Sequence, residues 1–120
     1  MKKSVEIKIG DKTHELCYNI RTLDKYERLL GKSITFLFAA GTASLVRQTD
    51  IRFTVSGMIV GLNLKDEDAA YDLIDLYCKE GGTLDQLNAK IIEAVLATGL
   101  FTTGTAKELE KVVPKESKEE

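Results

Sequence analysis

The sequence predicts an α+β domain that is mainly α-helical, with about five helices packed on a short N-terminal β-hairpin. Two patterns predict this class: apolar side chains alternate near the N-terminus, and later segments carry them at helical spacing between capping residues and glycines. A length of 120 residues and an apolar content of 43% suit one hydrophobic core. We therefore expect a single domain over residues 1–101, followed by a charged flexible tail over residues 102–120.

Residues 4–20 predict the hairpin, with its turn at Gly10 and Asp11. A two-residue loop would place Glu6 opposite Glu15, whereas a four-residue loop would place Lys8 opposite Glu15. We expect the wider loop, because opposite charges then face each other. Since an isolated hairpin is marginally stable, one face must lie on helices. The side chains available to that face are Val5, Ile7, Ile9, Leu16, Tyr18 and Ile20.

Two short helices are expected next, each between a capping residue and a glycine. Thr22 can cap the first, which Gly31 would end in a left-handed conformation. Ser33 and Gly41 bound the second in the same way. The apolar stripes are Leu23, Tyr26, Leu29 and Leu30 in the first helix, and Ile34, Leu37 and Phe38 in the second.

Asp50 can open a third helix, on which Gly57 and Gly61 lie four residues apart. Glycines at this spacing also occur where membrane helices dimerise, but here we interpret them as positions where a neighbouring helix approaches closely. The expected core residues of this helix are Ile51, Val55, Met58, Ile59 and Leu62.

Two further helices complete the domain. Asp66 or Asp68 can start the fourth, which ends at a pair of glycines. Thr83 and Gln86 have the spacing of a capping box at the start of the fifth. If Gly99 ends that helix, Leu100 should pack back onto Val95 or Ala94. The expected stripes are Ala70, Leu73, Ile74, Tyr77 and Cys78, then Leu84, Leu87, Ile91 and Val95 widened by Ile92 and Leu96.

Charge and cysteine usage narrow the class of function. The net charge of −2 gives no positive field for phosphate backbones or anionic lipid, so we expect neither nucleic acid nor membrane as a partner. No apolar run is long enough to span a bilayer, and no signal peptide is visible. Cys17 and Cys78 fit free, buried thiols in the cytosol better than a disulfide.

No residue pattern indicates catalysis, a cofactor or a bound metal. His14 and Cys17 are three apart, so on a strand they point to opposite faces and cannot share a metal. Acidic residues at 66, 67, 68, 72 and 75 lack the spacing of a calcium loop and suit a solvated helix start. Phosphate-binding glycine loops and nucleophile elbows are absent from the sequence. We expect no enzymatic activity.

Some apolar side chains lie outside the predicted core-facing stripes of the helices. Phe36 points away from the stripe of the second helix, and Phe53 and Val60 stand off the stripe of the third. Phe101 lies beyond the last helix, and either folds under the hairpin or meets another chain. We interpret Phe36, Phe53, Val60 and Phe101 as candidate partner-binding residues; burial of a central helix on several sides is the alternative for those within helices.

The order of these parts resembles the tail assembly chaperones of long-tailed bacteriophages and prophages. The resemblance covers residues 4–101 and is most specific in "LDKYERLLGKSI" and "EGGTLDQLNAKIIEAVLATGLF". It implies a protein of the bacterial host cytoplasm that binds the tape measure protein, keeps it soluble and helps to recruit tail tube subunits. It also implies self-association and absence from the mature virion. A structural or connector protein of the phage head-tail assembly is the alternative.

Overall fold

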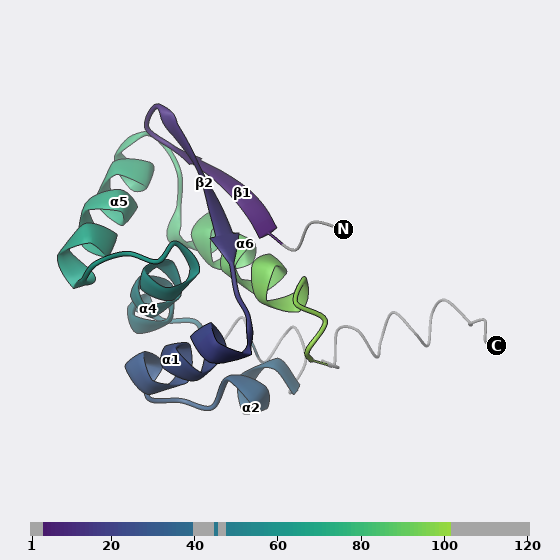
Figure 1. The fold of residues 1–120 in the computed structure, drawn as a ribbon. Coiled ribbons are helices and arrows are strands. Elements are labelled where there is room, and N and C mark those ends of the chain that lie inside the picture. The colour runs from purple at the N-terminus through teal and green to yellow at the C-terminus, as the bar shows by residue number, and fades with distance from the viewer. Residues whose placement is uncertain (1–3, 40–44, 46–47, 102–120) are drawn as a thin grey trace, which may run out of the picture.

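The computed structural model describes residues 4–39, 45 and 48–101, and these form a β-hairpin followed by helices (Figure 1). The predicted α+β class, with a two-stranded antiparallel hairpin and five helices in these residues, is confirmed. The predicted tail over residues 102–120 and the predicted stop at Gly41 lie outside the described residues. The elements are β1 Ser4–Ile9, β2 Lys12–Cys17, α1 Ile20–Leu30, α2 Ile34–Ala39, α4 Ile51–Gly61, α5 Glu67–Lys79 and α6 Leu84–Leu96.

The hairpin has the two-residue loop, so the four-residue loop expected from charge pairing is wrong. Glu6 faces Glu15, and Ile9 faces Lys12 across the turn. Both registers place the same side chains on the inner face, because they differ by two residues. Turn chemistry therefore decides: Gly10 has a φ of 65°, as required of glycine at the first central position of a tight hairpin turn. The two glutamates lie on the exposed face, where water weakens their repulsion.

Helix α4 is the centre of the fold. Every residue from Phe53 to Gly61 is buried, because α1, α5, α6 and β2 all contact this helix. Figure 1 shows α4 between α1 and α5, while α6 runs along the hairpin. The inner face of the hairpin packs into the same core through Val5, Ile7, Ile9 and Leu16. Ile20 was expected to join them, but it begins α1 and is exposed.

Two buried tyrosines bind the backbone of α4 beside its glycines. The Tyr26 hydroxyl donates to the Phe53 carbonyl at 2.8 Å, and the Tyr18 hydroxyl donates to the Gly57 carbonyl at 2.7 Å. A Cβ atom at Gly57 would lie 2.7 Å from the Tyr26 hydroxyl oxygen, and one at Gly61 would lie 2.5 Å from that of Tyr18. The predicted close approach of a helix is confirmed at Gly57, which faces Tyr26 of α1, but the neighbours of Gly61 are Leu16 of β2 and Tyr18 just after it. Burial raises the pKa of both tyrosines, so both hydroxyls stay protonated.

Capping side chains start the helices largely where the sequence predicted. Ser33, Asp50, Asp66 and Thr83 each accept a hydrogen bond from an amide in the first turn that follows. The capping box of Thr83 and Gln86 is confirmed. The exception is α1, where Asn19 is the cap and Thr22 is its capping-box partner three residues later. The prediction of Thr22 as the cap named the wrong member of this pair.

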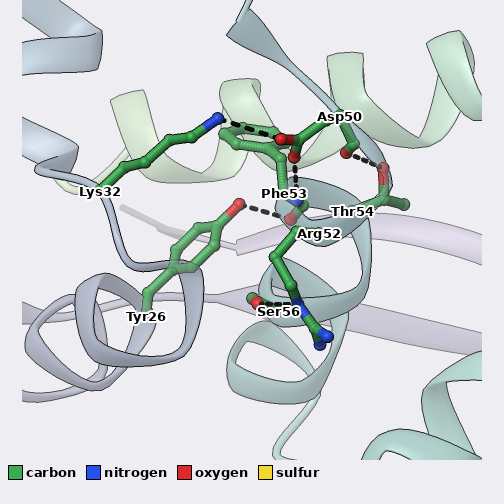
Figure 2. A network of polar contacts seen from close by, with 7 residues as sticks. All are labelled: Tyr26, Lys32, Asp50, Arg52, Phe53, Thr54 and Ser56. Atoms are coloured by element: carbon green, nitrogen blue, oxygen red, sulfur yellow. Dashed lines mark hydrogen bonds and ion pairs between the residues drawn. The ribbon is translucent and has the colours of Figure 1, made fainter.

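Asp50 joins the start of α4 to the loop between α1 and α2 (Figure 2). Its side chain accepts from the Phe53 amide at 2.8 Å and from Lys32 Nζ at 3.0 Å. Burial raises the pKa of Asp50, but the hydrogen bonds from Lys32 and Phe53 and the charge of Lys32 lower it more. The net result is a pKa below the usual 3.8.

Candidate functional site

Two of the four candidate partner-binding residues are sealed inside the protomer. Phe53 is 0% exposed and Val60 is also buried, so neither offers a surface to another chain. Phe53 packs against the ring of Tyr26, with ring centroids 5.7 Å apart. The expectation that they face a partner is therefore wrong, because α4 is buried on all sides from Phe53 to Gly61. The alternative of a central helix buried on several sides holds for both.

Phe101 is half-buried against α2. Its ring stacks on the ring of Phe38 with centroids 5.5 Å apart, so it lies neither under the hairpin nor fully open to solvent. Gly99 has the predicted positive φ, at 74°. Leu100, which we expected to pack onto Val95 or Ala94, is instead 50% exposed and lines a groove with Ile20. This turn thus directs the last described residues towards α1 and α2.

Phe36 is the predicted residue that remains accessible. It is 65% exposed, while Ile34, Leu37 and Phe38 on the same helix are buried. The Ser33 cap holds the Phe36 amide at 3.0 Å and so defines the first turn of α2. Aromatic residues are enriched at protein interfaces, so we keep Phe36 as a candidate anchor for a partner.

A groove of about 660 Å³ lies beside α1 and α2. Its apolar lining includes Ile20, which is 71% exposed, together with the inner residues Leu23 and Ile34. Its polar lining contains both signs of charge, from Arg21, Asp24 and Glu27. Phe36 does not line the groove but is exposed on the same α2 helix. We call these exposed and half-buried apolar side chains the α1–α2 surface: Ile20, Phe36, Leu100 and Phe101.

A second apolar groove, of about 500 Å³, lies between α4, α5 and the start of α6. We call it the α4–α5 groove; it is lined by Ile51, Val55, Tyr71, Ile74, Asp75, Cys78 and Leu84. This surface was not predicted from the sequence, because Ile51 was assigned to the core but is 66% exposed. The sequence did contain a signal for this exposure, because Ile51 is the first residue of its helix, directly after the Asp50 cap. Side chains at a helix end are often not covered by neighbouring elements.

The candidate chemical groups do not gather into a site. His14 lies on the inner face of the hairpin, paired across from Ile7, whereas Cys17 lies on the outer face opposite Ser4. Both cysteines are free and exposed, so the expectation of buried thiols is wrong. Asp66 caps α5, and Glu67 forms an ion pair with Arg52 at 2.8 Å. Among the described residues, no group of three His, Cys, Asp or Glu side chains could hold a metal ion.

A search of the described helices finds none that is long and apolar enough to cross a bilayer. Comparisons of the chain with protein-family models, with curated proteins and with solved structures gave no match.

Proposed function

We propose that this protein is a non-enzymatic tail assembly chaperone of a long-tailed bacteriophage or prophage. It binds the tape measure protein in the bacterial host cytoplasm, keeps it soluble and helps to recruit tail tube subunits. It self-associates and leaves before the virion is complete. The sequence resemblance over residues 4–101 supports this reading, and so does the small hairpin-and-helix domain.

The observation that carries the proposal is the α1–α2 surface. Phe36 and Ile20 are each more than half exposed on ordered helices, and Leu100 adds a third accessible apolar side chain. The groove lined by Ile20, Leu100 and Phe101 can accept the apolar face of a helix, with anchors at every third or fourth residue. Shielding such a face from water would keep a long helical partner from aggregating.

Co-expression with the tape measure protein of the same phage tests the proposal. The chaperone should raise the soluble fraction of that protein, and the two should elute together in size-exclusion chromatography. Phe36→Ser should weaken the complex about tenfold or more while leaving the melting temperature nearly unchanged, because Phe36 contributes little to the core. Phe36→Leu, which keeps an apolar side chain, is the matched control and should retain most of the binding.

Two results would contradict the proposal. One is the absence of a complex at micromolar concentrations together with unchanged solubility of the tape measure protein. The other is the presence of this chain in purified virions, which would favour a structural or connector subunit instead.

A further inference from the structure

We propose that the α4–α5 groove is a second docking site, which takes an amphipathic helix with apolar anchors and basic flanks from a partner protein. It shares no lining residue with the groove beside α1 and α2. One protomer could therefore hold two partners at once. The proposal for this groove does not depend on which partner binds the α1–α2 surface.

The apolar floor of the groove comes from three helices. Ile51 and Val55 belong to α4, Tyr71 and Ile74 belong to α5, and Leu84 begins α6. Ile51 and Tyr71 are exposed, and Ile74 and Leu84 are half-buried, so the groove presents apolar surface to water. Such a lining between helices suits a partner helix that inserts side chains from successive turns.

The charge beside the groove selects the partner. Asp75 lines it, and Asp72 is exposed three residues earlier on the same helix, whereas Asp68 lines a separate pocket at the start of α5. Of the four carboxylates on α5, Glu67 is paired with Arg52 and Asp68 lies at the start of the helix, so Asp72 and Asp75 are the acidic side chains nearest the groove. A partner helix with lysine or arginine beside its apolar stripe would meet this acidic side, whereas an acidic helix would be repelled.

The nearest arginine, Arg52, does not neutralise the carboxylates beside the groove. Arg52 follows Ile51 on α4, and its guanidinium forms an ion pair with Glu67 at 2.8 Å. Its Nε atom also lies 3.4 Å from Ser56 Oγ, so the side chain is held on α4 (Figure 2). By contrast, the groove beside α1 and α2 carries Arg21 among its lining together with Asp24 and Glu27. The lining of the α4–α5 groove thus contains a carboxylate and no basic side chain, whereas the lining of the other groove contains both signs of charge.

Two cysteines allow a direct test on the full chain. Cys78 lines the groove, whereas Cys17 is exposed on β2. The probe is a synthetic helix of about 18 residues, with leucines at every third or fourth position and flanking lysines. It should slow modification of Cys78 by a thiol reagent at least about fivefold, with Cys17 unaffected, as followed by mass spectrometry. A twin peptide with glutamates in place of the lysines should protect Cys78 much less.

Substitutions then test which residues of the groove contribute to binding of the peptide. Ile51→Ser should weaken binding of the basic peptide about tenfold, since it removes an exposed anchor. Asp72→Lys with Asp75→Lys should reverse the preference between the two peptides. Phe36→Ser is the control on the α1–α2 surface and should leave Cys78 protection unchanged. Three outcomes would overturn the proposal. The two peptides could protect Cys78 equally, neither could protect it, or Phe36→Ser could abolish the protection while Ile51→Ser does not.

Discussion

At the scale of single residues, Gly57 and Gly61 leave room on α4 for two tyrosine hydroxyls. Each hydroxyl donates to the carbonyl four residues before the glycine that it faces: Tyr26 to Phe53 and Tyr18 to Gly57. The glycine spacing predicted a close approach correctly. It could not predict that tyrosines make this approach, because Tyr18 and Tyr26 reach α4 only through the tertiary fold.

Gly57→Ala should destabilise the protein by about 1–3 kcal/mol, although alanine favours an isolated helix. The new Cβ would lie 2.7 Å from the Tyr26 hydroxyl and 3.0 Å from Ile91 Cδ1, and Tyr26 is fully buried. Chemical denaturation measures this change in the free energy of unfolding.

Tyr26→Phe supplies the matched test of the cause. By itself it should cost about 0.5–1.5 kcal/mol, the net value of one hydrogen bond. Combined with Gly57→Ala it should cost less than the sum of the two, because the atom nearest the new Cβ has been removed. Strict additivity would show that the hydroxyl does not limit space at Gly57.

At the scale of the elements, local sequence signals predicted the helices. They failed where the sequence allowed two alternatives, as for the cap of α1 and the register of the hairpin. Caps and stop glycines depend on neighbours within a few residues, so the starts of α2, α4, α5 and α6 were predictable. Asn19 and Thr22 exchange hydrogen bonds within one capping box, which explains the wrong choice of cap for α1. The hairpin register depended on the turn conformation of Gly10 more than on the facing charges.

The start of α4 should show a pH dependence that comes from Asp50. Its pKa is lower in the folded protein than in the unfolded chain, so its ionised form adds stability above the unfolded value. This contribution is lost as the pH falls through the folded pKa. Asp50→Asn keeps a good cap but removes the charge. At pH 7 it should cost up to about 1 kcal/mol, because the Asp50 side chain is 49% exposed and the ion pair is solvated.

The stability difference between the wild type and Asp50→Asn should shrink as the pH falls below the usual aspartate range and be smallest once Asp50 is protonated in the folded protein. Urea unfolding at several pH values measures it. Lys32→Gln is the control, because Lys32 supplies the cation that favours the ionised form. In that background the cost of Asp50→Asn should fall. A difference that does not change with pH would show that the Asp50 charge contributes nothing to folding.

At the scale of the whole molecule, the division of apolar residues between core and surface was the least predictable feature. Helical spacing identifies an apolar stripe, but it does not say how many sides of a helix its neighbours cover. Phe53 is buried because four elements surround α4, whereas Ile51 is exposed at the end of the same helix. Of the four residues predicted to form an excess of apolar surface, only Phe36 is exposed, while Phe53 and Val60 belong to the core and Phe101 is half-buried against it.

Phe101 fixes the last described segment of the chain to the rest of the fold. Its stacking on Phe38 joins the segment after α6 to α2, and it packs against the main core cluster. Phe101→Ser should therefore destabilise the protein by about 1–2 kcal/mol, less than full burial of an aromatic ring would give. The melting temperature should fall by about 5–10 °C, measured by circular dichroism. Phe36→Ser exchanges the same residue types at an exposed position and should shift it by less than about 2 °C. Equal, small shifts for both variants would mean that Phe101, like Phe36, serves only as partner-facing surface.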